Sequence, residues 1–216
     1  MAFPRGTVLF RGVGHVRVPH EGQSMPSTSS SQQAFRRYWR MRKPRELREG
    51  ARYHVTARAN RKEMILESRA NRDLFLSVVR RAKRKYSFRI ENFCVMGNHY
   101  HLVIVPMKGE SLSAIMRWIM GVFAMAFNKL HGYVGHVWCE RYFSRVIASI
   151  RDLVATFDYI DNNPVRAMLV EDGAAWPYGG LWESLSGRHD LTEGDSPLIR
   201  LLFPDRQIRL LPSSRH

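Results

Sequence analysis

Residues 51–163 alternate between strand-like and helix-like hydrophobic patterns, and this order strongly limits the folds open to the chain. Alternating polarity in segments rich in Val, Tyr and Phe predicts strands, and apolar residues at three- and four-residue spacing predict helices. The resulting order is β-α-β-β-α-β-α. Its first six elements match the split β-α-β, ferredoxin-like class of α+β fold, an antiparallel sheet with helices on one face. The expected strands are 51–57, 88–95, 99–105 and 137–147, and the expected helices are 71–86, 112–130 and 152–163.

The charge balance indicates the class of partner. The 216 residues include 34 Lys or Arg against 19 Asp or Glu, a net charge of +15. A chain this basic usually binds a polyanion, and nucleic acid is the first candidate, although a basic protein without such a partner remains the alternative. No apolar run reaches eighteen residues, so no membrane span is expected. Two cysteines are too few for a disulfide scaffold or a Cys-rich zinc site, and we expect reduced thiols in the cytoplasm.

Three regions are expected along the chain. Residues 1–43 are basic and Ser-rich, and we predict a flexible extension that is either a phosphate-binding arm or an over-long gene start. Residues 44–182 hold the patterned region and form the expected catalytic domain. Residues 183–216 are polar apart from a short apolar patch, and we predict a loosely structured tail.

The segment His99-Tyr100-His101 is the first chemical feature. Residues two apart on a strand point to the same face, so both imidazoles project together while Tyr100 points the other way. Two neighbouring histidines form half of a site for a divalent metal. Taken alone, such a pair is more often incidental.

Tyr159 and Asn163 are the second feature. Four residues apart on the predicted third helix, they share one helical face. The alternative is structural: Tyr159 packs as a half-buried aromatic, and Asn163 caps the helix before Pro164.

Together these features resemble the HUH endonucleases, in which two histidines bind a metal and a tyrosine attacks single-stranded DNA. The local motifs are most similar to the REP-associated tyrosine transposases among the single-tyrosine HUH transposases. The resemblance covers about residues 44–182 and rests on four ordered motifs. These are RYHVTARANRKEMIL (52–66), MGNHYHLVIVP (96–106), GHVWCERYFSRVI (135–147) and YIDNNPVRAMLV (159–170).

The resemblance implies an HUH palm with an added C-terminal helix that carries the nucleophile Tyr159. His99 and His101 would bind Mg²⁺ or Mn²⁺, with Asn163 completing the ligand set. Zinc is not expected, because no thiolate or third histidine is placed nearby. Cleavage would form a covalent 5′-phosphotyrosine and free a 3′-hydroxyl. The middle position of the histidine motif is usually aliphatic or otherwise bulky and apolar, and Tyr100 departs from that pattern.

The expected partner is single-stranded or hairpin DNA near the nucleoid. We expect no nucleotide cofactor, because the chain lacks a phosphate-binding GxxxxGK[ST] loop, and either a monomer or a homodimer. Non-catalytic or degenerate hairpin binding on the same fold is the main alternative, and a relaxase or replication-initiator nuclease is another. The candidate DNA-binding residues are Arg52, Arg58, Arg61, Lys62, Arg141, Arg145 and Arg166.

Overall fold

The computed structural model describes residues 48, 50–192 and 196–204, all within the unit Arg45–His216. The predicted extension of residues 1–43 lies outside the described residues. The strands are β1 (Tyr53–Arg58), β2 (Phe88–Val95), β3 (His99–Pro106) and β4 (Phe143–Val146). The helices are η1 (Asn60–Lys62), α2 (Arg69–Lys85), α3 (Leu112–His131), α4 (Ile150–Asp161), α5 (Asn163–Arg166), η2 (Gly173–Ala175), α6 (Gly180–Leu185) and α7 (Pro197–Leu202).

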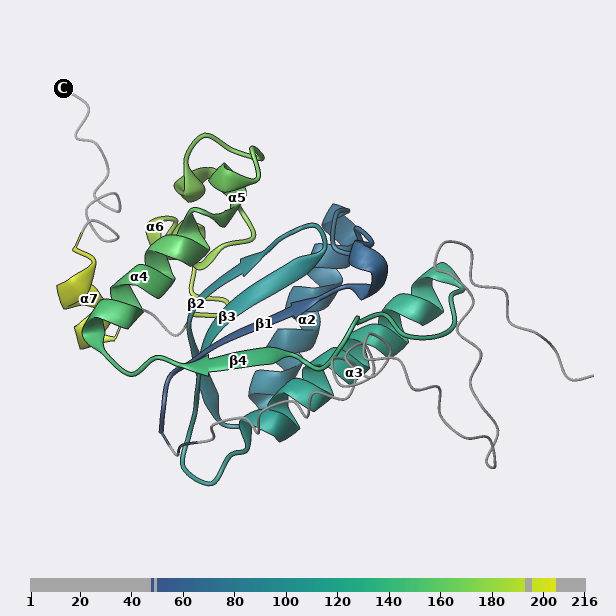
Figure 1. The fold of residues 1–216 in the computed structure, drawn as a ribbon, viewed down its shortest axis with the longest axis horizontal. Helices are drawn as coiled ribbons and strands as arrows, with labels where there is room; N and C mark the ends of the chain where they lie inside the picture. Colours follow the sequence, from purple (N-terminus) through teal and green to yellow (C-terminus); the bar gives the residue numbers. More distant parts are fainter. Residues whose placement is uncertain (1–47, 49, 193–195, 205–216) are drawn as a thin grey trace, which may run out of the picture. The chain divides into compact units, whose positions relative to one another are not determined.

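The four strands form one sheet in the order β2-β3-β1-β4, and every neighbouring pair is antiparallel. Strand β3 lies between β1 and β2, which are joined through α2, as the split β-α-β arrangement requires. Figure 1 shows α2 and α3 running together across the sheet. The predicted fold class is therefore confirmed.

Alternation along β3 divides the interior into two cores. Tyr100, Leu102 and Ile104 are fully buried in a large core with α2 and α3. Val103 points to the opposite face and packs in a smaller core with Phe157 of α4. The sheet thus has α2 and α3 on one face and α4 on the other, because successive side chains leave a strand on opposite sides.

The helix ends follow local capping chemistry. Ser68, Ser111 and Ser149 each accept a hydrogen bond from a backbone N–H in the first turn of α2, α3 and α4. Helix α3 ends at Gly132, whose φ of 66° is left-handed, as expected of a glycine after a helix. No helix in the described part of the chain is long and apolar enough to cross a membrane.

The predicted strand 137–147 is wrong over most of its length, since only Phe143–Val146 pairs as a strand. Before it, Trp138 forms an isolated bridge to Ala59, and its indole N–H donates to the Met120 carbonyl. Tyr142 is also buried. These anchors hold the segment as an irregular loop, whereas the strand prediction rested on its aromatic and β-branched composition.

The described part of the C-terminal segment, residues 183–192 and 196–204, includes buried contacts and helix α7. The Glu183 carboxylate accepts hydrogen bonds from the Leu191 N–H and from both the N–H and the hydroxyl of Thr192. Ile199 of α7 is buried, and the Phe203 ring stacks on Phe157 with centroids 4.8 Å apart. These buried contacts involve residues within 183–192 and 196–204, and the polar composition of the segment concealed them.

Candidate active site

Strand β3 places His99 and His101 on the face of the sheet opposite Tyr100. Their ring centroids lie 5.0 Å apart. His101 is 4% exposed, and its Nε2 atom is buried without a hydrogen-bond partner among the described residues. His99 is half-buried, and its Nδ1 lies 2.7 Å from Asn98 Oδ1. Tyr100 is fully buried, and its hydroxyl finds no partner in the described structure.

A third histidine, which the sequence analysis missed, lies beside this pair. His54 Nε2 is 2.9 Å from His101 Nδ1, and the two rings stack with centroids 5.2 Å apart. The register brings them together, because β1 pairs His54 with Val103 and Thr56 with His101. The available signal was the polar alternation of β1, in which His54, Thr56 and Arg58 share one face. We call this side of the sheet the histidine face.

Helix α4 brings Tyr159 to the histidine face. Its ring centroid is 5.4 Å from that of His101 and 6.1 Å from that of His54, in edge-on geometry. Phe157 and Ile160 on the same helix are fully buried, whereas Tyr159 is 41% exposed. The buried stripe anchors α4 and leaves the phenol between the histidines and solvent.

Asn163 lies just beyond α4, although the predicted helix 152–163 placed it on the same helix as Tyr159. Helix α4 ends at Asp161, and Asn163 begins α5 with Pro164, whose ring suits a first helical turn. The Asn163 Nδ2 donates to the Tyr159 carbonyl over 2.7 Å. The amide oxygen makes no hydrogen bond to His99 or His101, and the observed contact of Asn163 with the site is the one to the Tyr159 backbone.

Burial keeps the three imidazoles neutral. Desolvation, then Arg145, lowers the pKa of His54 to about 4, and desolvation, then Arg58, lowers the pKa of His99 to about 4. Desolvation, followed by the charges of His99, His54 and Arg58, lowers the pKa of His101 to about 3. Each ring therefore offers an unprotonated nitrogen at pH 7, which is the form that binds metals.

No three His, Cys, Asp or Glu side chains in the described residues converge as a metal site. His54 contacts the Nδ1 atom of His101, whereas the unpartnered atom is Nε2, so His54 is not placed as a third ligand. The pair of histidines nevertheless suits a divalent cation, because His101 Nε2 is buried and unpartnered and a bound ion would satisfy it.

The family model described as transposase IS200 like matches residues 48–163, more than half of the chain. The chain belongs to the IS200-like transposase family. A Haemophilus influenzae protein described as a REP-associated tyrosine transposase is 25% identical over 114 residues. That match covers 48% of this chain and 65% of the relative, so the chain spans just under two thirds of the relative's length.

A solved REP-associated tyrosine transposase bound to a REP hairpin has the same fold. It superposes with a TM-score of 0.59 at 21% identity, over 73% of this chain and 89% of that one. The predicted resemblance is thus confirmed. The family match of this chain, residues 48–163, includes His54, His99, His101, Tyr159 and Asn163.

Six of the seven candidate DNA-binding residues are exposed, and the seventh, Arg52, is half-buried. Arg58, Arg61, Lys62 and Arg141 are exposed. Arg145 is also exposed, but one of its guanidinium nitrogens donates to the Thr156 hydroxyl of α4 over 3.1 Å.

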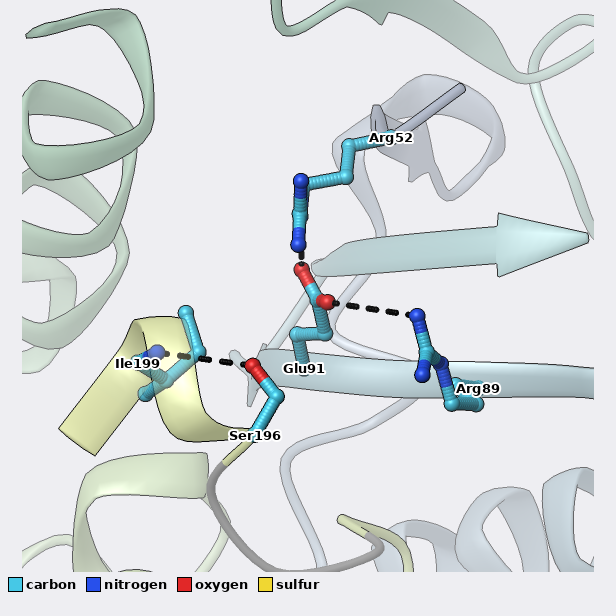
Figure 2. Close-up of polar contacts among 5 residues, drawn as sticks. All are labelled: Arg52, Arg89, Glu91, Ser196 and Ile199. Carbon is cyan, nitrogen blue, oxygen red and sulfur yellow. Dashed lines mark hydrogen bonds and ion pairs between the residues drawn. The ribbon is translucent and has the colours of Figure 1, made fainter. Parts of the chain in front are cut away.

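Arg166 and Arg52 have other environments. The Arg166 guanidinium lies 5.5 Å from the centroid of the Tyr159 ring. Arg52 binds the buried Glu91 carboxylate at 2.6 Å, and Arg89 lies 3.9 Å from its other oxygen, as Figure 2 shows beside Ser196 and Ile199 of the α7 start. Arg52 therefore serves an ion pair within the fold, and we do not carry it into the proposed DNA surface.

Helix α2 carries a basic run, which consists of Arg80, Arg81, Lys83, Arg84 and Lys85, and three of these residues contact other parts of the chain. The Lys83 ammonium donates to the Leu191 carbonyl over 2.6 Å, and Arg80 pairs with Asp190 at 3.6 Å. The Arg81 guanidinium lies 5.8 Å from the Trp118 ring. These contacts give the run a structural role that its charge alone did not reveal.

The lowered histidine pKa values predict loss of stability in mild acid. In the unfolded chain each imidazole gains a proton near pH 6.5, but in the folded chain it gains one only near pH 3 to 4. Between these values the unfolded state binds more protons, so the free energy of unfolding falls as the pH drops from 7 towards 4. Urea unfolding in EDTA at pH 7, 6 and 5 measures this. His54→Leu should give a shallower slope, and a flat wild-type profile would contradict the prediction.

Proposed function

We propose that this chain is a metal-dependent single-stranded DNA endonuclease and strand transferase with Tyr159 as its nucleophile. The observation that supports this most strongly is the edge-on contact of the partly exposed Tyr159 ring with the buried, neutral His101. The histidines and the tyrosine come from one chain, and we propose that a monomer is active. The solved relative is bound to a REP hairpin, and we propose a hairpin-forming repeat as the substrate here.

In the proposed cleavage, the Tyr159 hydroxyl oxygen forms a bond to the scissile phosphorus as the bond to the 3′ oxygen breaks. The phenol proton ends on the departing 3′-hydroxyl, and the 5′ end remains attached as a phosphotyrosine. A 3′-hydroxyl from a second strand then attacks this linkage, which restores the phenol and a phosphodiester. Because the phosphotyrosine linkage is itself a phosphodiester, its exchange for a new DNA phosphodiester needs no nucleotide cofactor.

His99 and His101 would hold Mg²⁺ or Mn²⁺ through their free nitrogens, with the Asn163 amide oxygen as a third protein ligand. When bound, such an ion polarises the scissile phosphate and offsets the charge developing on its oxygens. The Arg166 guanidinium, which lies against the Tyr159 ring, is placed to attract the phosphate towards the phenol. The hydrogen bond from Asn163 to the Tyr159 carbonyl connects the proposed ligand to the nucleophile's own backbone.

The experiment is incubation of the protein with end-labelled single-stranded hairpin oligonucleotides in Mn²⁺ or in EDTA, followed by a denaturing gel. We expect a protein-linked DNA band in Mn²⁺ that EDTA and His101→Ala remove, and mass spectrometry should place the nucleotide on the peptide containing Tyr159. Tight hairpin binding with no linked band would favour the alternative of a non-catalytic hairpin-binding protein.

We propose that unpaired bases bind the part of the histidine face that carries the exposed residues Phe143 and Arg58. The register aligns His101 on β3 with Thr56 on β1 and then with Phe143 on β4, and paired residues share a face. Phe143 is 60% exposed, whereas Trp138 and Tyr142 are buried. Exposed Arg58 lies opposite His99 in the same register. These two neighbouring rows provide a stacking ring and a cation, the combination that proteins use to bind single-stranded DNA.

Phe143→Ala is expected to weaken binding of single-stranded DNA by about 1–3 kcal/mol, the range for one stacked base. The thermal stability of the Phe143→Ala variant should change little, because the Phe143 ring is largely exposed. Fluorescence anisotropy with a labelled oligonucleotide measures the affinity. Tyr133→Ala is the matched control, since Tyr133 is 61% exposed in the loop after α3. An equal loss from both variants would argue against a specific role for Phe143.

A further inference from the structure

In both proposed ligand histidines, the Nδ1 atom has a hydrogen-bond partner. His99 Nδ1 lies 2.7 Å from Asn98 Oδ1, and His101 Nδ1 lies 2.9 Å from His54 Nε2. An amide oxygen only accepts hydrogen bonds, so His99 must carry its proton on Nδ1. This leaves the Nε2 of His99 with a free lone pair.

The orientation of Asn98 is itself fixed. Its Nδ2 donates to the Lys62 carbonyl over 3.3 Å, which leaves Oδ1 as the atom that faces His99. Lys62 and Arg61 of the η1 turn have φ values of 60° and 52°, a left-handed conformation that persists only where the surroundings hold it. The Asn98 bond is one contact that holds this turn.

The His101 ring allows two proton arrangements. If His54 donated to His101 Nδ1, the His101 Nε2 would carry a hydrogen with no acceptor, since that atom is buried and unpartnered in the described structure. If His101 Nδ1 donates to His54, the buried Nε2 instead presents a lone pair that a cation can satisfy. Metal-binding histidines commonly donate their other ring N–H to a neighbouring acceptor in this way.

We propose that His54 and Asn98 are positioning residues that hold both histidines as Nδ1–H tautomers, with both Nε2 lone pairs available to one divalent cation. This inference rests on the proposed metal-dependent function. His54 acts through His101 and touches neither metal nor DNA. It therefore orients a ligand without being one, in agreement with the absence of a three-residue metal cluster among the described residues.

The first test needs no variant. In metal-free protein, long-range ¹H–¹⁵N spectra report which ring nitrogen carries the proton. We expect His99 and His101 both to be Nδ1–H tautomers at pH 7.5, with assignments made by comparison with His99→Ala and His101→Ala. An Nε2–H tautomer at either position would overturn the proposal.

The second test measures Mn²⁺ affinity by titration calorimetry. His54→Leu removes the acceptor and should raise the Kd about 10- to 100-fold, the usual cost of losing such a partner. His54→Gln supplies an amide oxygen and should recover part of the loss. Asn98→Leu and Asn98→Asp form the equivalent pair for His99. His189→Leu, at an exposed position of the C-terminal segment, should bind Mn²⁺ as the wild type does.

The outcomes separate the two proposals. Equal Mn²⁺ affinity of the wild-type protein and His54→Leu would overturn the positioning role and leave the proposed function intact. Wild-type protein that binds no Mn²⁺ would overturn the metal-dependent function and this inference with it. Weaker Mn²⁺ binding by both leucine variants, recovered in part by the Gln and Asp variants, is the result that supports the proposal.

Discussion

Tyr159→Phe is expected to abolish the covalent protein–DNA adduct and to lower strand cleavage by at least about 10³-fold, as removal of a nucleophile commonly does. Phenylalanine keeps the ring that lies 5.4 Å from His101 and 5.5 Å from the Arg166 guanidinium. It lacks only the oxygen that would bond to phosphorus. Fold, hairpin affinity and Mn²⁺ affinity should therefore remain near wild type, and the denaturing gel isolates the chemical step.

Tyr100→Phe is the matched control for this variant. Tyr100 lies between the two histidines in sequence, but it is fully buried on the opposite face, where its hydroxyl has no partner in the described structure. Burial and the nearby Tyr142 also raise the pKa of the Tyr100 phenol, which disfavours a phenolate. Adduct formation should survive its loss. Adduct retained in Tyr159→Phe, or lost in Tyr100→Phe, would reject Tyr159 as the nucleophile.

Phe157→Ala is expected to lower the free energy of unfolding by about 3–5 kcal/mol, the usual cost of truncating a fully buried Phe. The ring packs in the small core with Val103 and stacks on Phe203. Because Tyr159 follows two residues later on α4, a loosened helix should also lower adduct yield under conditions where the protein is still folded. Urea unfolding and the adduct assay measure the two effects.

Ile150→Ala provides the comparison on the same helix. Ile150 is 57% exposed at the start of α4, so its truncation should change the free energy of unfolding by no more than about 0.5 kcal/mol. Equal effects from the two substitutions would show that buried packing at Phe157 does not anchor the helix.

Local patterns predicted much of this molecule. Alternation along β3 placed His99 and His101 together and Tyr100 opposite, because a strand allows only two directions for its side chains. The predicted helix 112–130 matches α3 at its first residue and within one residue at its last. Residue identities over 51–163 were thus sufficient for the element order, the fold class and the family resemblance, whereas the roles of the site residues and the domain boundaries remain predictions.

Local sequence patterns did not predict contacts between segments that lie far apart along the chain. His54 precedes His101 by 47 residues, and only the pairing of β1 with β3 brings His54 Nε2 within 2.9 Å of His101 Nδ1. Arg52 looked free to bind phosphate until the sheet placed Glu91 beside it. The predicted strand before β4 failed because α3 offers the Trp138 indole an acceptor that no local pattern announces.

Local sequence therefore determined where most helices and strands form, because hydrophobic periodicity and helix capping depend on residues within one or two turns of each other. Tertiary packing alone decided which polar groups were buried, paired or left open, because burial and hydrogen bonding depend on partners far away in sequence. For the site, this meant that the histidine pair and Tyr159 were visible in the sequence. Only the folded sheet revealed the third imidazole, the lowered pKa values of all three rings and the exposure of Phe143 beside them.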